Sequence, residues 1–377
     1  MSAGLFAAQQ ADLDRLAQMG RLRALAPRRG VDFASNDYLG LADSGVLADA
    51  AREAIARGVP VGSGGSRLLR GNHDEHEALE AEAAAFFGAE AALFLPTGFT
   101  ANSALVATMP QRGDRIFADE LIHASCHEGL RLTRAPWQLV AHNDVAAFAD
   151  AIARWRAEGG TGTPWILVES LYSMDGDCAP LEGLDALARA TGAVLVVDEA
   201  HATGVFGPGG RGLVASLPQR GDHVMTLHTL GKALGCEGAL LCGPAVMRAF
   251  LVNRARGFIF STAPSPLAAA IARAALRLCA GADDLRAQLM MRIARAGLLL
   301  GPLGAQCHGS PIMPLVLGAD TRTMDVAARA QQAGFDVRGI RPPTVPEGTA
   351  RLRIVITLNA AEAEIARLAA VLQEILA

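Results

Sequence analysis

The sequence predicts an α/β fold, with a large, doubly wound and mostly parallel sheet followed by a small α+β C-terminal domain. Three observations lead to this prediction. Short apolar runs alternate with helical patterns from about residue 45 to 240, as they do in βαβ units. The runs are continuously apolar, which is typical of parallel strands covered on both faces. A chain of 377 residues can also bury one large core and add smaller parts.

The N-terminal residues and the large domain supply the first expected elements. An amphipathic helix is expected over residues 2–26, because leucines there follow a helical spacing. In the large domain, helical patterns such as "HEALEAEAAAFFG" and "LEGLDALARATG" fill the gaps between strands, and Gly192 is expected to end the second one. The expected strands are "AALFLP", "RIFADE", "WILVES", "AVLVVDEA", "VMTLHTLG" and "GALLCG".

The C-terminal third has a different pattern. One long helix is expected after "STAPSP" (261–266), reaching about residue 300. Three apolar runs, "IMPLVLG", "GFDVRGI" and "RLRIVIT", then alternate with two helices, which indicates a small α+β domain. We therefore expect an N-terminal helix and arm over 1–45, a large domain over 46–280 and a small domain over 281–377.

Bulk composition excludes several classes of partner. Hydrophobic residues make up 51% and charged residues 19% of the chain, as in an ordinary folded protein. The net charge of −4 gives no electrostatic reason to expect nucleic acid. No apolar stretch reaches the length of a membrane span, so no membrane partner is expected. The six cysteines include no C-x-x-C pair, which favours a reducing cytoplasm.

The stretch "DEAHATGVFGPGGRG" (198–212) contains two patterns that suggest a site. Gly207, Gly209 and Gly212 fit the dinucleotide pattern G-x-G-x-x-G. However, nine residues separate the preceding apolar run from Gly207, whereas a dinucleotide loop leaves its strand directly and opens a helix. The context therefore argues against a nucleotide site and leaves the acid and the histidine to be explained.

Polar groups follow three of the expected strands, where ligands of such sheets bind. These groups are Glu169 and Ser173, Asp198 and His201, and Thr229 and Lys232. A lone lysine between glycines is more often a solvated loop residue, but the acid on the preceding strand favours a site. An amine that forms a Schiff base and a carboxylate for a pyridinium nitrogen are the two protein groups that pyridoxal phosphate needs.

Motifs from about residue 13 to the C-terminus resemble those of the α-oxoamine synthases, which are pyridoxal-phosphate enzymes of fold type I. The motifs are "SNDYLGL" (35–41), "GSGGSRLLRGNHDEHEALE" (62–80), "PTGFTAN" (96–102), "DELIHASCHEG" (119–129), "SMDGDCAPL" (173–181), "DEAHATGVFG" (198–207), "TLGKALG" (229–235) and "RPPTVPEGTARLRI" (341–354). They occur in order and without large gaps, so their combination is far more specific than any one of them.

The resemblance implies catalytic and cofactor-binding roles for matched residues. Lys232 would bond to the cofactor and later remove the α-proton of the amino acid. Asp198 would hold the pyridinium and His201 the ring oxygen, while His123 would stack on the ring. Ser173 would assist near the ring oxygen. The phosphate end would be surrounded by Gly98, Phe99 and Thr229, and substrate would be bound by Arg23, Asn36, Thr344 and Arg353.

The family pattern also implies a reaction and an assembly. It favours a decarboxylative condensation of L-alanine with a pimeloyl thioester, carried by coenzyme A or by an acyl carrier protein, in biotin synthesis. A homodimer with shared active sites is implied, in which Ser261 and Thr262 reach the neighbour's cofactor phosphate. Two alternatives stay open: a glycine-using synthase that makes 2-amino-3-oxobutyrate or 5-aminolevulinate, and a non-catalytic binding protein on the same fold.

A metal site is the competing explanation for one motif. His123, Cys126 and His127 could form a zinc trio, because histidines four residues apart share a helix face. There is no obvious fourth ligand, and a stacking histidine explains the motif fully. No metal is therefore expected.

Overall fold

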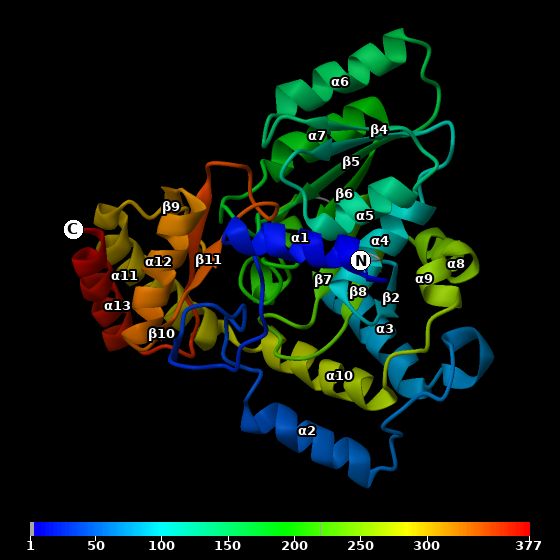
Figure 1. Ribbon diagram of the computed structural model, residues 1–377. Coiled ribbons are helices and arrows are strands. Elements are labelled where there is room, and N and C mark those ends of the chain that lie inside the picture. Colours follow the sequence, from blue (N-terminus) through cyan, green and yellow to red (C-terminus); the bar gives the residue numbers. More distant parts are fainter. Residues whose placement is uncertain (1–3, 219) are drawn as a thin grey trace. The chain divides into compact units, whose positions relative to one another are not determined.

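The computed structural model describes residues 4–218 and 220–377 (Figure 1). Contacts group these residues into two compact units. The larger unit contains residues 36–173 and 177–288, and the smaller unit contains residues up to 35, residues 174–176 and residues 289–377.

The larger unit is built on a seven-stranded sheet that confirms the expected α/β class. Its strands, in spatial order, are β2 (Ala91–Leu95), β8 (Ala239–Gly243), β7 (Val224–Thr229), β6 (Val194–Asp198), β5 (Pro164–Glu169), β3 (Arg115–Asp119) and β4 (Trp137–Val140). The five strands from β7 to β4 run parallel to one another. Their carboxyl ends therefore meet at one edge of the sheet.

Two strands differ from the expectation. The run "GALLCG" forms β8, which is antiparallel to both of its neighbours rather than parallel. A continuous apolar run reports burial on both faces and does not fix the strand's direction. Strand β4 was not expected, because it is an edge strand in which Trp137 and Leu139 are more than two-fifths exposed.

Helices cover both faces of this sheet. Trp165 and Leu167 belong to one hydrophobic cluster, with α4, α5, α8 and α9, whereas Ile166 and Val168 belong to another, with α6 and α7 (Figure 1). The helices of this unit are α2 (Gly45–Ala56), α3 (Asp74–Phe87), α4 (Gly98–Thr108), α5 (Ala124–Leu132), α6 (Val145–Ala157), α7 (Leu181–Thr191), α8 (Ala245–Arg254), α9 (Arg256–Ile259) and α10 (Pro266–Ala280), with shorter turns at Arg67–Gly71, Pro208–Gly210 and Leu213–Ser216. Gly192 ends α7 in a left-handed conformation, as expected.

The prediction of a single helix from about residue 266 to 300 is wrong. The segment is divided into α10 and α11 (Asp283–Leu300). The N–H of Gly281 bonds to the carbonyl of Leu278 at the end of α10. Asp283 and Asp284 then occupy the first turn of α11, where negative charge is favoured by the helix dipole.

The N-terminal helix is shorter than expected. Helix α1 spans Ala7–Gln18, whereas the spacing of leucines predicted a helix over 2–26, of which residues 2 and 3 lie outside the described residues. Gly20 has a φ of +66°, and this left-handed conformation ends the helix. Leu22 and Leu25 therefore lie beyond α1.

The smaller unit has the expected α+β composition. Its antiparallel sheet has the order β11 (Arg338–Ile340), β12 (Ala350–Val355) and β9 (Ile312–Gly318). The expected strand "GFDVRGI" is divided at Val337 into β10 (Phe335–Asp336) and β11, which belong to different sheets. Helices α12 (Asp320–Gln332) and α13 (Glu362–Leu376) pack together, and a short turn spans Gly301–Leu303.

The N-terminal residues group with the C-terminal part of the chain. Strand β1 (Val31–Asp32) pairs in parallel with β10. Arg21 forms ion pairs with Asp320, at 2.6 Å, and with Glu347, at 2.7 Å. The expected division at residues 45 and 280 stays a prediction. Within the described residues, no helix has the length and the apolar composition needed to cross a membrane.

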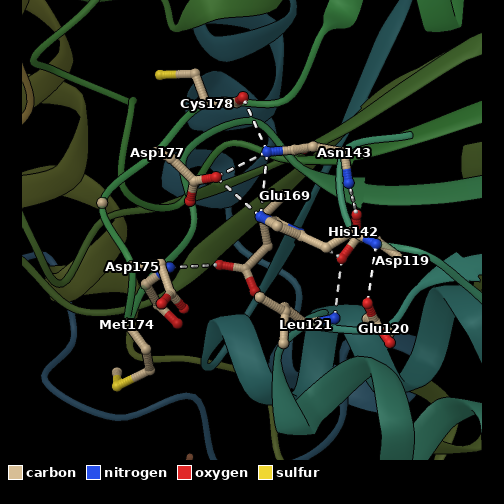
Figure 2. A network of polar contacts seen from close by, with 12 residues as sticks. Asp119, Glu120, Leu121, His142, Asn143, Glu169, Met174, Asp175, Asp177 and Cys178 are labelled. Atoms are coloured by element: carbon tan, nitrogen blue, oxygen red, sulfur yellow. Dashed lines mark hydrogen bonds and ion pairs between the residues drawn. The ribbon is translucent and has the colours of Figure 1, made fainter. Parts of the chain in front are cut away.

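A half-buried group of polar side chains, here called the His142 cluster, joins the end of β3 to the loops that follow β4 and β5 (Figure 2). It contains Asp119, His142, Asn143 and Asp177. His142 Nδ1 lies 2.9 Å from an oxygen of Asp119, and its Nε2 lies 2.8 Å from an oxygen of Asp177. The side chain of Asn143 donates to Asp177 and its backbone N–H donates to Asp119. Because both ring nitrogens face carboxylates, the geometry favours an imidazolium.

Burial acts against this charge, but the carboxylates outweigh it. Burial lowers the pKa of His142, whereas the hydrogen bonds to Asp119 and Asp177 raise it, and the resulting pKa is about 10. The folded state therefore keeps the proton over a range in which an unfolded histidine, with a pKa of about 6.5, loses it.

We expect His142→Gln to destabilise the protein most near pH 6 and progressively less toward pH 10. The folded pKa is raised, so the stabilisation is complete below about pH 6.5 and falls by at most about 1.4 kcal/mol per pH unit as the pH rises further. Urea unfolding of both proteins across this range measures the difference. A difference in unfolding free energy that stays constant with pH would contradict the assignment.

His223→Gln is the matched control, because His223 contacts a single carboxylate, that of Asp185 at 2.7 Å. Its effect at pH 7 should be smaller than that of His142→Gln.

Candidate active site

A cavity of about 170 Å³ lies at the carboxyl ends of the parallel strands of the larger unit. Four of these strands end in a polar residue, namely Asp119, Glu169, Asp198 and Thr229. Open α/β sheets bind ligands at this edge. The cavity is lined by Gly98, Phe99, Asn102, His123, Ser125, Glu169, Asp198, Ala200, His201, Leu227, Thr229 and Lys232.

Asp198, the last residue of β6, is held by two N–H donors. Its Oδ2 accepts a hydrogen bond of 2.6 Å from the side-chain amide of Asn102, and its Oδ1 accepts one of 2.9 Å from the backbone N–H of Ala200. The side chain is 5% exposed. Both oxygens act as acceptors, which is the pattern of a carboxylate. Asn102 was not among the residues predicted from the sequence, although it lies four residues after Gly98 and therefore on the same face of α4.

His123 is the N-cap residue of α5 and is connected to Asp198 through two other side chains. Its Nδ1 lies 2.8 Å from Ser125 Oγ, which accepts a hydrogen bond of 3.0 Å from Asn102. Burial lowers the pKa of His123; Asp198 opposes this shift and Lys232 reinforces it. A neutral imidazole that is fixed at one nitrogen and lines the cavity is compatible with a stacking role.

His201 is fixed from a distant part of the sequence. Its Nδ1 lies 2.5 Å from the hydroxyl of Tyr38, and both side chains are buried. The same hydroxyl lies 3.3 Å from the side-chain oxygen of Asn36. Tyr38 thus connects Asn36 to His201. Tyr38 was not predicted as a site residue, although it lies in the motif "SNDYLGL".

The N-terminus of α4 faces the cavity through Gly98 and Phe99. The first N–H groups of a helix lack intrahelical partners and attract anions. A Cβ on Gly98 would lie 3.7 Å from Thr229 Oγ1, an ordinary contact, so sterics alone do not require glycine there. Phe99 is 50% exposed, which argues against a simple core role.

Lys232 lies in the turn between β7 and β8, and its side chain is half-buried. The turn is closed by the N–H of Gly235, which donates to the Lys232 carbonyl at 2.9 Å. Gly235 has a φ of +63°, and a Cβ there would lie 2.5 Å from the Ala42 nitrogen. The last glycine of "TLGKALG" is therefore required by both backbone conformation and close packing.

Other expected residues lie outside this cavity. Ser173 is buried and its N–H donates to Glu169, but it is not part of the lining. Ser261 and Thr262 follow α9 and do not line it either. Their roles stay predictions.

The remaining substrate residues belong to the smaller unit. Nη2 of Arg23 donates a hydrogen bond of 3.4 Å to Thr344 Oγ1. Arg23 also lines a separate cavity of about 540 Å³. Arg353 lies on β12 and is 6% exposed, and Arg351 on the same strand forms an ion pair with Asp175 at 2.5 Å. Their roles toward substrate also stay predictions.

The residues that line the cavity of about 170 Å³ fit pyridoxal phosphate. They supply an amine, a fixed carboxylate, a neutral imidazole and a helix N-terminus. Two buried oxygens in the lining, Asn102 Oδ1 and Glu169 Oε1, have no hydrogen-bond partner among the described residues, as expected where a polar ligand completes a site. No group of three or more potential metal ligands occurs in residues 4–218 and 220–377.

Comparison with known proteins shows the family of this chain. The model of the aminotransferase class I and II family matches residues 28–372. An 8-amino-7-oxononanoate synthase of Anaeromyxobacter sp. (strain K) is 42% identical over 385 aligned residues, which cover 97% of this chain and 95% of that protein. The enzyme of the same name from Herminiimonas arsenicoxydans is 43% identical and covers 91% of this chain and 89% of that protein.

Solved structures of related enzymes have the same fold as this chain. An 8-amino-7-oxononanoate synthase from Francisella tularensis has a TM-score of 0.75 at 27% identity, covering 92% of this chain and 97% of that one. Serine palmitoyltransferase of Sphingomonas wittichii has a TM-score of 0.89 at 26% identity, covering 100% and 98%. These likenesses confirm the fold type I transferase fold and pyridoxal phosphate as the cofactor. The chain belongs to the aminotransferase class I and II family and, within it, to the 8-amino-7-oxononanoate synthases.

Proposed function

We propose that the chain condenses L-alanine with a pimeloyl thioester, releasing carbon dioxide and the free thiol, to give 8-amino-7-oxononanoate for biotin synthesis. Relatives that bear this enzyme's name support the reaction. The observation that carries the proposal for this chain is that Lys232, Asp198 and His123 line one cavity at the strand ends.

Each of these residues has a distinct task. Pyridoxal phosphate, when bound, supplies an electron sink for the α-carbon of the amino acid. Lys232 would hold the cofactor through its amine and, once displaced, take the α-proton as a base. Asp198, whose two oxygens accept hydrogen bonds from Asn102 and from the Ala200 N–H, would keep the ring nitrogen protonated. His123 would stack on the ring, and His201, fixed by Tyr38, would bond to the ring oxygen.

The phosphate and substrate ends use other groups. The N-terminus of α4, with Gly98, Phe99 and Thr229, would hold the phosphate, and Ser173 would assist near the ring oxygen. Arg353 would bind the carboxylate of alanine, and Arg23, Asn36 and Thr344 would line the substrate path. Coenzyme A and an acyl carrier protein both fit the proposal, because both present a thioester on the same kind of arm. The six cysteines are all free thiols, which supports a reducing cytoplasm.

Product analysis tests the function directly. We expect the purified protein, given alanine and pimeloyl thioester, to form 8-amino-7-oxononanoate with a higher kcat/KM than with glycine and an acetyl or succinyl thioester. One methyl group in a pocket changes kcat/KM by about 10- to 200-fold, so slow use of glycine is compatible with the proposal. Mass spectrometry of crossed reactions identifies the products. Glycine with a short thioester as the best pair would instead favour the glycine-using synthases.

We also propose a homodimer in which Ser261 and Thr262 contact the cofactor phosphate of the partner subunit. Both residues lie outside the lining of the cavity in their own larger unit. Their hydroxyl groups are suitable donors to a phosphate.

Mixed dimers test the shared site. Thr262→Glu, which places a negative charge against the phosphate, and Lys232→Ala, which removes the base, should each be nearly inactive alone. In a mixed dimer with a shared site, both defects fall in one active site and the other is intact, so activity returns. No recovery after verified subunit exchange would mean that Thr262 serves its own subunit.

A further inference from the structure

Glu169 is a buried acid in the cavity to which the mechanism above gives no role. It is the last residue of β5 and is paired in register with Asp198, the last residue of β6. Side chains at paired positions of neighbouring strands lie on the same face of the sheet. Both residues line the cavity (Figure 2 shows Glu169), and Glu169 is 2% exposed.

The two oxygens of Glu169 have unequal surroundings. Oε2 accepts a hydrogen bond of 3.1 Å from the backbone N–H of Ser173. Oε1 is buried and has no partner among the described residues. A buried polar atom left unpaired is costly, so a donor or an acceptor on a bound ligand is expected to complete it.

Burial and the charges that face Glu169 together favour its protonated form. Asp198 on β6 and Asp119 on β3 repel a negative charge, and Lys232 attracts one. Burial raises the pKa of Glu169 well above its usual range, Asp198 raises it further, and Lys232 and the Ser173 N–H only partly oppose this. Cys126 on α5 also faces the pair, and burial together with both acids raises the pKa of its thiol, so it stays uncharged.

Two adjacent buried carboxyl groups do not both ionise readily. Asp198 receives two N–H donors, one on each oxygen, whereas Glu169 receives one. The negative charge therefore belongs on Asp198 and the proton on Glu169. A protonated Glu169 has one oxygen that accepts from Ser173 and one O–H that donates into the cavity.

We propose that Glu169 is a further cofactor-binding residue, a neutral carboxylic acid that donates a hydrogen bond from Oε1 to an acceptor at the ring end of the bound cofactor. The ring end is indicated because the paired residue Asp198 serves the ring nitrogen. This inference rests on the proposed function, since it requires the cavity to bind pyridoxal phosphate.

Two substitutions test whether Glu169 acts as a neutral hydrogen-bond donor or as an anion. In Glu169→Gln, the amide oxygen can accept from Ser173 and the amide N–H can donate into the cavity, so the variant reproduces the protonated acid. Glu169→Met keeps a similar length but has no donor. Titration of the apo-proteins with pyridoxal phosphate, followed by the visible absorption of the bound cofactor, gives the Kd in each case.

We expect Glu169→Gln to stay within about threefold of the wild-type Kd and Glu169→Met to weaken binding at least about fivefold, the lower limit for an unpaired buried group. A Gln variant as weak as the Met variant would overturn the proposal, because an anion would then be required. A Met variant with the wild-type Kd would also overturn it, even if its KM for alanine rose, because the acceptor would then belong to the substrate.

Infrared spectroscopy of the apo-protein tests whether Glu169 is protonated when no cofactor is bound. The carbonyl band of a protonated carboxylic acid should appear in wild-type apo-protein and be lost in Glu169→Gln; its absence from the wild type would overturn the proposal. This measurement and the Gln variant decide the question if Glu169→Met does not fold.

Glu199→Gln is the matched control. Glu199 is also buried and bonds to Ser170 at 2.8 Å and to the Leu213 N–H at 3.0 Å, but it does not line the cavity. It should leave the cofactor Kd unchanged. A wild-type protein that binds no pyridoxal phosphate would instead mark a failure of the proposed function.

Discussion

The site depends on one buried carboxylate, that of Asp198 at the end of β6. A negative charge in an apolar sheet is costly unless it is paired. The fold offsets this cost locally, with the Asn102 amide on one oxygen and the Ala200 N–H on the other. Asn102 also contacts Ser125, which contacts His123. Asn102 on α4 therefore connects the carboxylate that we propose for the ring nitrogen to the imidazole that we propose for stacking on the ring.

The loops around this carboxylate are held by a second set of charges. His142, between Asp119 and Asp177, joins the end of β3 to the loops after β4 and β5, and β5 carries Glu169 beside Asp198. Parallel strands make such an arrangement possible because all their carboxyl ends meet at one edge. The same geometry brings acids close together, so protons and cations must be shared among them. With protons on His142 and, as we propose, on Glu169, Asp198 is the carboxylate that is left for the cofactor.

Much of this could be predicted from the sequence, and the failures have physical causes. Continuous apolar runs predicted the buried strands, and the polar residues that end them predicted Asp198, His201, Thr229 and Lys232 in one site. The same runs could not show that β8 is antiparallel, since burial is the same in either direction. Leucine spacing extended α1 past Gly20, where backbone conformation ends it. Tyr38 and Asn102 were missed because their partners, His201 and Asp198, are distant in sequence.

The most direct test is the exchange of the α-hydrogen of alanine with solvent deuterium in Asp198→Asn, followed by NMR. The substitution keeps the shape of the side chain and removes the charge that we propose holds the ring nitrogen protonated. We expect exchange to slow by at least about 100-fold, a loss typical of removing a fixed electrostatic group from a catalytic site, while absorption shows that cofactor is still bound. Exchange at nearly the wild-type rate would contradict the central role of Asp198.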